Sequence, residues 1–155
     1  MEPGGNEPEA AMVPEFRDHP AYDETAQANR KILTDALDAL LEGREDAFWA
    51  IFDPEVTFHE ASCLPYGGAH VGLEATKKAY AFLCEHFSKM RSVMEAVLAS
   101  RDVVMIYQTI TFEAADTGKS GTLPVAELFR LRDGKVIEWR AHYFDACMVA
   151  EALRG

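Results

Sequence analysis

The sequence has too few positive charges to bind polyanions. It carries 15 lysine and arginine residues against 26 aspartate and glutamate residues, a formal net charge of −11 at pH 7. Nucleic acid backbones and anionic membrane surfaces both require a positively charged stripe on the protein. The basic residues stand singly or in pairs among acidic ones, as Lys77 and Lys78 do. We therefore expect neither nucleic acid nor a membrane among its partners.

Cysteines and long apolar runs are also scarce. Cys63, Cys84 and Cys147 are odd in number and contain no Cys-x-x-Cys pair, so neither a zinc site nor a redox pair is predicted. No apolar run approaches the roughly 18 residues of a membrane span. The amino terminus lacks the basic-then-apolar order of a signal peptide. These features favour a soluble, cytoplasmic protein.

Motifs that carry cofactor, metal or nucleophile chemistry are missing as well. The sequence contains no Gly-x-Gly-x-x-Gly, no Walker loop, no His-Glu-x-x-His and no Gly-x-Ser-x-Gly. His70 and His86 have no neighbours at metal-ligand spacing. We therefore predict no cofactor and no metal.

The chain divides into an amino-terminal arm and one domain. Residues 1–21 combine prolines, glycines and acids without an apolar period, which is typical of a flexible arm. The remaining residues 22–155 match the usual size of one domain, and 48% hydrophobic residues suffice for a sizeable core.

Two periodicities predict the secondary structure. Apolar residues recur every three to four positions from Asp23 to Gly43 and over 73–89, with a short helix over 45–52 and another at the carboxy terminus. A period of two appears around Phe58 and over 92–100, 103–114, 121–132 and 135–145, where Asp133-Gly134 is the strongest hairpin signal. The pattern predicts an α+β domain, a curved antiparallel sheet packed against three helices around a pocket.

Three strands each carry one polar residue in an apolar register. Glu60 shares its parity with Val56 and Phe58, and Gln108 and Glu127 stand in equally apolar registers of later strands. A carboxylate on an apolar face is expected to have a raised pKa, as a general acid or base near neutral pH requires. Alternatively, either glutamate pairs with an arginine (Arg130 or Arg140) or lies at a wet edge, and Gln108 is a satisfied core amide.

The last strand places His142 in the same register as Glu138, Arg140 and Phe144. This register is either the solvated outer face, or a bulge or strong twist turns His142 inward, where its imidazole would carry a proton.

Several further residues are candidates to bind a substrate. Tyr66, beside Gly67 and Gly68, predicts either a pocket rim or a plain turn. Arg140 and Tyr143 are polar candidates on the last strand. Aromatic side chains would either line an apolar cavity or form ordinary core: Trp49, Phe58, Phe82 and Phe87.

The order of elements over residues 26–153 resembles the nuclear transport factor 2-like superfamily, which includes SnoaL-like proteins, ketosteroid isomerase and limonene epoxide hydrolase. ALLEGREDAFWAIFDPEVTFHE is similar to the ketosteroid isomerase stretch that leads to the general-base aspartate, with Glu60 in that place. VAELFRLRDGK similarly puts Glu127 where that family has a protonated oxyanion-hole aspartate. The resemblance implies a cone-shaped, cystatin-like roll and a homodimer formed through the exposed face of the sheet.

The chain departs from both enzyme patterns. The first-helix tyrosine of ketosteroid isomerases falls on Ala36, so steroid isomerisation by that route is not expected. The aspartate-arginine-aspartate set of limonene epoxide hydrolase would fall on Ile110, Gln108 and either Ala141 or His142, so that triad is not expected either.

The residues and the resemblance together predict a cofactor-independent enzyme that acts by proton transfer on a small, apolar, oxygenated molecule. It would be an isomerase, cyclase, dehydratase or lyase. Glu60 would be the base and a protonated Glu127 would donate a hydrogen bond to an enolate oxygen. Gln108 would orient the substrate and His142 would shuttle the proton. The alternative is a noncatalytic module for ligand binding or dimerisation.

Overall fold

The computed structural model describes residues 23–155, so the predicted arm over residues 1–21 lies outside the described part. The described part is a mixed α+β fold, which confirms the predicted fold class. Its elements are, in order, α1 (Glu24–Leu41), α2 (Glu45–Trp49), β1 (Phe52–Glu60), β2 (Gly68–Val71), α3 (Leu73–Glu85), β3 (Phe87–Ala99), β4 (Val103–Ala114), β5 (Ser120–Arg132), β6 (Lys135–Tyr143) and α4 (Ala146–Leu153).

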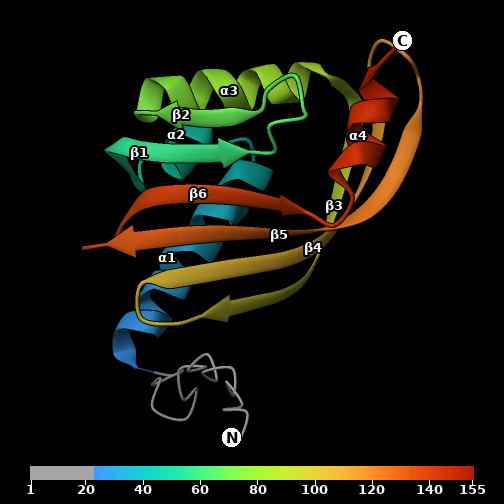
Figure 1. Ribbon diagram of the computed structural model, residues 1–155. Coiled ribbons are helices and arrows are strands. Elements are labelled where there is room, and N and C mark those ends of the chain that lie inside the picture. Colours follow the sequence, from blue (N-terminus) through green and yellow to red (C-terminus); the bar gives the residue numbers. More distant parts are fainter. Residues whose placement is uncertain (1–22) are drawn as a thin grey trace, which may run out of the picture.

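The six strands form one curved sheet in the order β2-β1-β6-β5-β4-β3 (Figure 1). Hairpins join β3 to β4, β4 to β5 and β5 to β6, so these neighbours are antiparallel. β1 instead lies parallel to β6, although residues 61–134 separate the two strands in the chain. Bulges, one in β3 beside Met94 and one in β6 at Ile137, shift the register, and bulges add local bend and twist to a sheet.

The helices cover one face of the sheet, called the inner face below. α1 crosses behind β6, β5 and β4, α3 lies over β1 and β2, and α4 lies inside the bend of β5 (Figure 1). Fully buried side chains gather between these helices and the sheet: Leu33, Phe48, Val56, Phe58, Val104, Phe129, Val136 and Val149. None of the helices within residues 23–155 is long and apolar enough to cross a membrane.

The ends of the helices show where local signals suffice. The Asp23 side chain accepts a hydrogen bond from the Ala26 amide at 2.7 Å and caps α1, which ends just before Gly43 at φ 78°. The predicted helix over 73–89 is wrong at its end, because α3 stops at Glu85 and Phe87 already pairs with Ala114 in β3. Phe87 satisfies the apolar position of both periods, so periodicity alone does not separate helix from strand there.

The turn between β5 and β6 confirms the strongest hairpin signal. Asp133 and Gly134 have φ values of 52° and 74°. A type I′ turn requires positive φ at both central residues, which an Asp-Gly pair tolerates well. This turn aligns β5 with β6 and so brings Glu127 opposite Ala141.

Candidate active site

Glu60, the last residue of β1, is a buried carboxyl group with an unsatisfied oxygen. Its side chain is on the inner face, the residue is only 8% exposed, and Oε2 has no hydrogen-bond partner within residues 23–155. Burial raises the pKa of Glu60 to about 8; a hydrogen bond from Tyr143 opposes this rise, and the nearby Glu127 adds to it. Glu60 can therefore take up or release a proton near neutral pH.

Two tyrosines connect to Glu60. Tyr143 ends β6, and its hydroxyl hydrogen-bonds to the Glu60 carboxylate and to the hydroxyl of Tyr66, which lies in the loop after β1. Burial raises the pKa of both tyrosines above the ordinary phenol value. Both phenols stay protonated. Tyr143 is the donor in both contacts and has a single O–H, so it donates to Glu60 or to Tyr66 at any one time.

Glu127 on β5 is held by a chain of hydrogen bonds across four strands. Ser92 Oγ on β3 donates to Gln108 Oε1 on β4, and Gln108 Nε2 donates to Glu127 Oε1 at 2.6 Å. Trp139 Nε1 on β6 donates to Glu127 Oε2 at 2.8 Å. Burial raises the pKa of Glu127, and the hydrogen bonds from Trp139 and Gln108 lower it. A neutral Glu127 can still accept both bonds and has one O–H left to donate.

The two carboxyl groups lie in one row across the inner face. Glu127 pairs with Ala141, and the parallel register His59 to Arg140 places the next residue of β1, Glu60, beside Ala141 as well. Two strand spacings separate their backbones by about 10 Å. Ala141 stands between them and contributes only a methyl group to the inner face.

This row lies at the boundary between the two apolar clusters of the core. Phe129 and Trp139 belong to one cluster, and Val125, Tyr66 and the partly buried Tyr143 to the other. The surroundings of Ala141 on the inner face are therefore apolar, with a carboxyl group on the neighbouring strand on either side.

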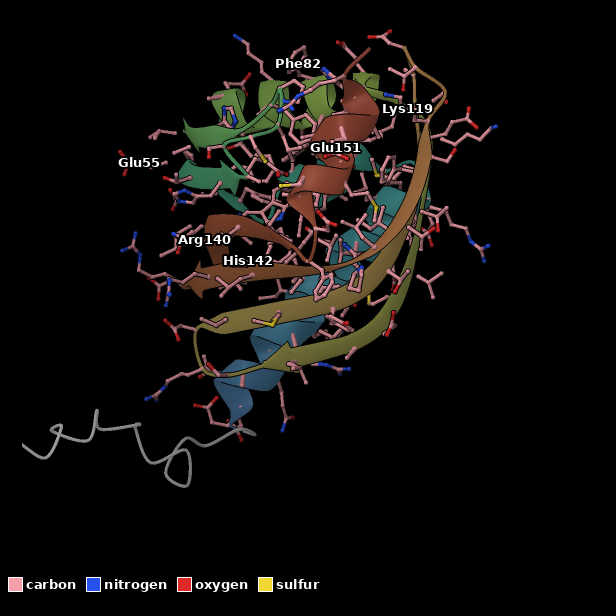
Figure 2. The ribbon with its side chains drawn as sticks, turned by 45° about the vertical axis from the view of Figure 1, so that its right-hand side comes forward. Glu55, Phe82, Lys119, Arg140, His142 and Glu151 are labelled. Carbon is pink, nitrogen blue, oxygen red and sulfur yellow. The ribbon has the colours of Figure 1, made fainter. Side chains whose placement is uncertain are left out.

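Neither carboxyl group is neutralised by an arginine of the described residues. Arg130 pairs with Asp102 at 2.9 Å and with Glu138 at 3.3 Å, and Arg140 pairs with Glu138 as well. The alternative in which Arg130 or Arg140 neutralises Glu60 or Glu127 is therefore wrong. Arg140 is exposed on the outer face, away from both carboxyl groups, so the structure does not bring this candidate to the site (Figure 2).

His142 also lies on the outer face, in front of the sheet in Figure 2, whereas α1 lies behind it. A bulge is present in β6, but it falls at Ile137 and brings both Val136 and Trp139 inward. Beyond it the side chains alternate again, so Ala141 and Tyr143 face inward and His142 faces outward. Of the two alternatives for His142, the solvated outer face is therefore confirmed, and the inward position produced by a bulge or strong twist is wrong; His142 lies apart from Glu60 and Glu127.

The aromatic candidates separate into two groups. Trp49 and Phe58 are buried, Phe58 stacks on Trp139 at 4.3 Å between ring centroids, and Phe87 is partly buried against Phe112. Phe82 is 45% exposed and projects from the side of α3 that faces away from the sheet (Figure 2). α3 instead buries Ala79 and Leu83, so Phe82 does not line the inner face.

Sequence reasoning missed Ser92 and Trp139. Ser92 is a polar residue in the register of Met90 and Met94, the same kind of signal that singled out Gln108. Trp139 cannot be told apart from an ordinary core residue in the sequence. When it is buried, however, its indole N–H needs a hydrogen-bond acceptor, and Glu127 supplies it.

Other features of the described residues are less suited to chemistry. No group of three His, Cys, Asp or Glu side chains within residues 23–155 is arranged to hold a metal ion. An open groove of about 1000 Å³ lies between α1 and β3, but Glu60 and Glu127 are not among its lining residues.

A curved sheet packed against helices on one face is the fold of the nuclear transport factor 2-like class. Three solved structures share this fold. A nuclear transport factor 2-like protein from Burkholderia pseudomallei is 20% identical with a TM-score of 0.72, and the match covers 83% of this chain and 98% of the other. A protein from Jannaschia sp. designated a SnoaL-like polyketide cyclase is 23% identical with a TM-score of 0.71, covering 86% and 98%. A protein from Rhodopseudomonas palustris designated an isomerase is 18% identical with a TM-score of 0.63, covering 81% and 96%.

Within this class, the chain belongs to the SnoaL-like domain family, whose model matches residues 33–139. The matched part contains Glu60, Gln108, Glu127 and Trp139. No curated protein matches the sequence.

Proposed function

We propose that this protein is a cofactor-independent enzyme that moves a proton within a small, largely apolar, oxygenated molecule, as an isomerase, cyclase, dehydratase or lyase does. One observation carries the proposal: Glu60 is buried, its Oε2 has no partner, and its pKa is raised to about 8. A group with these properties is suited to proton transfer near neutral pH. The designations cyclase and isomerase among proteins of the same fold support a reaction of this kind.

The geometry suggests how the two carboxyl groups divide the work. Ionised Glu60 takes a proton from a carbon next to a carbonyl group. The electron pair of that C–H bond forms the C=C bond of an enolate, and the π pair of the carbonyl group moves to its oxygen. Neutral Glu127 donates its O–H to the oxyanion that develops there, while Gln108 and Trp139 hold its carboxyl group in place. Glu60 then returns the proton to a carbon of the enolate. Tyr143 stabilises ionised Glu60 through its hydrogen bond.

The proposal is testable without the natural substrate, because an enolisable ketone exchanges its α-hydrogens when a base removes them. We expect the protein to accelerate deuterium exchange into 2-tetralone in D₂O, followed by NMR. Glu60→Gln should lower the catalysed rate by about 10² to 10⁴, the usual contribution of a general base. His142→Gln, on the outer face, should leave it unchanged. Equal rates for the Glu60→Gln variant and the wild type would remove Glu60 as the base.

The same assay has an expected pH dependence. Only ionised Glu60 accepts a proton, so kcat/KM should rise about tenfold per pH unit below about 8 and level off above it. The Glu60→Gln variant should lack this limb. Activity that falls as pH rises through this range would show Glu60 acting as an acid instead.

A noncatalytic binding module is the second candidate function. It is favoured by one observation: both oxygens of Glu127 already accept hydrogen bonds from Gln108 and Trp139, as in a purely structural buried carboxyl group. Binding of 2-tetralone without accelerated exchange would support this candidate.

We also propose that the protein is a cytoplasmic homodimer that pairs through the outer face of its sheet. Val93 and Leu98 on β3 and Tyr107 on β4 are 48%, 61% and 39% exposed on this face. Exposed Arg91 and Glu95 flank them, so a two-fold axis can place opposite charges together. The three free cysteines suit a reducing compartment.

Light scattering tests the pairing. The expected mass is twice the 17.2 kDa of one chain. Leu98→Glu should yield monomers, because it buries a charge in the interface, whereas Leu41→Glu on α1 should not. A wild-type mass of 17.2 kDa would refute the dimer.

A further inference from the structure

The edge strand β3 turns three neighbouring side chains onto the inner face. Met90 pairs with Phe112, Ser92 with Ile110, and Met94 with Gln108, and paired residues share a face of the sheet. Phe112 and Gln108 are buried, yet Met90 and Met94 are 46% and 43% exposed. The inner face is therefore partly exposed to solvent at β3, next to the buried Gln108.

A third methionine lies near the same partly exposed part of the inner face. Gly121 on β5 pairs with Phe112 on β4, which continues the row that begins at Met90. Met148 Sδ on α4 lies 3.1 Å from the position that a Cβ on Gly121 would take, and Met148 is 36% exposed. Met90, Met94 and Met148, called the methionine rim below, thus border this part of the inner face from the sheet and from α4. Thioether side chains are flexible and make favourable contacts with aromatic rings.

Ser92, between the two methionines of β3, has a defined hydrogen-bonding polarity. A hydroxyl group has one proton, and Ser92 Oγ donates it to Gln108 Oε1. Its lone pairs remain, so it can accept a hydrogen bond from a bound molecule but has no second proton to donate. The molecule must therefore supply the donor, as an alcohol or a phenol does and a ketone or an ether does not.

The charged neighbours on β3 face the other way. Lys89 pairs with Glu113 and Arg91 with Thr111, in the register opposite to Met90 and Ser92. No lysine or arginine of β3 thus reaches the inner face, which favours a neutral ligand over an anionic one.

From these contacts we infer that the methionine rim and Ser92 form a subsite at the mouth of the proposed active site. The subsite binds a flat, neutral ring system through a hydroxyl group that donates to Ser92 Oγ. The inference rests on the proposed function, since it assigns the hydroxyl-bearing end of the substrate to Ser92 and leaves the enolisable end for Glu60 and Glu127.

Two ligands that differ only in the donor test the role of Ser92 by calorimetric titration. 2-Naphthol carries a hydroxyl group, and 2-methoxynaphthalene has the same ring and oxygen but no proton to donate. Ser92→Ala should weaken binding of 2-naphthol about 3- to 10-fold, the effect of one hydrogen bond, and leave 2-methoxynaphthalene within about twofold. Equal effects on both ligands would overturn the role of Ser92.

The rim has its own matched control. The double variant Met90→Ala/Met94→Ala should weaken both ligands about tenfold through lost sulfur–ring contacts. Lys89→Ala changes the outer face of the same strand, apart from the proposed dimer contact, and should leave both unchanged. Unchanged binding in the methionine variant, or no saturable binding of 2-naphthol by the wild type, would overturn the subsite.

Deuterium exchange separates this inference from the proposed function. If Glu60→Gln abolishes exchange but the rim and Ser92 variants bind normally, the subsite fails and the function stands. If binding follows the rim and Ser92 while Glu60→Gln leaves exchange unchanged, the function fails and the subsite stands.

Discussion

In alkaline solution, Glu60→Gln should make the protein more stable than the wild type, and this advantage should nearly vanish in mild acid. An unfolded glutamate ionises near pH 4.5, whereas Glu60 in the folded protein ionises near pH 8. Between these values unfolding releases a proton, so the free energy of unfolding of the wild type falls as pH rises, and the loss is complete above about pH 8. Glutamine does not ionise and escapes this loss.

The size of the effect follows from the pKa shift. Each unit corresponds to about 1.4 kcal/mol, so the stability difference between variant and wild type should grow by about 4 kcal/mol from pH 5 to pH 9. Urea unfolding at several pH values measures it. The matched control is Glu55→Gln, an exposed glutamate on the same strand, which should give a curve parallel to that of the wild type (Figure 2).

Parallel curves for Glu60→Gln and the wild type would contradict the prediction. Glu60 would then ionise in the folded protein as it does in the unfolded chain, and the physical basis for its proposed role as a base would be lost. The expected result would instead show that the group proposed to transfer the proton costs the fold stability, as active-site groups often do.

Phe58→Ala should lower the free energy of unfolding by about 3–5 kcal/mol, the usual cost of removing a buried ring. Phe58 is fully buried and stacks on Trp139, which in turn donates to Glu127. Phe82→Ala is the matched control, since this ring is 45% exposed on α3, and it should cost less than about 1 kcal/mol.

Urea unfolding of the two variants also decides between two interpretations of Phe58. A cost below about 1 kcal/mol would mean that the ring borders an open pocket and leaves no cavity when removed. The expected larger cost would place Phe58 in the core that supports Trp139 and, through it, the carboxyl group of Glu127.

Local patterns predicted much of the site because strand alternation is a local property. Glu60, Gln108 and Glu127 stood out as polar residues in apolar registers, and the structure brings all three to the inner face. Where two periods overlap, as at Phe87, the pattern did not locate the end of α3. The prediction that Phe82 lines a cavity or belongs to the core failed for a related reason. A helix with apolar residues on more than one side does not reveal which side contacts the sheet.

Short stretches of sequence are enough to predict the α+β class, the Asp133-Gly134 turn and the three polar exceptions, since each depends on residues close together in the chain. That β1 lies beside β6, which aligns Glu60 with Ala141 and Glu127, became known only from the fold. The fold also decided that the bulge falls at Ile137 and leaves His142 outside, and that Ser92, Gln108, Glu127 and Trp139 join across four strands. These relations depend on which strands pair and in what register, and strand pairing is set by contacts between residues far apart in the chain.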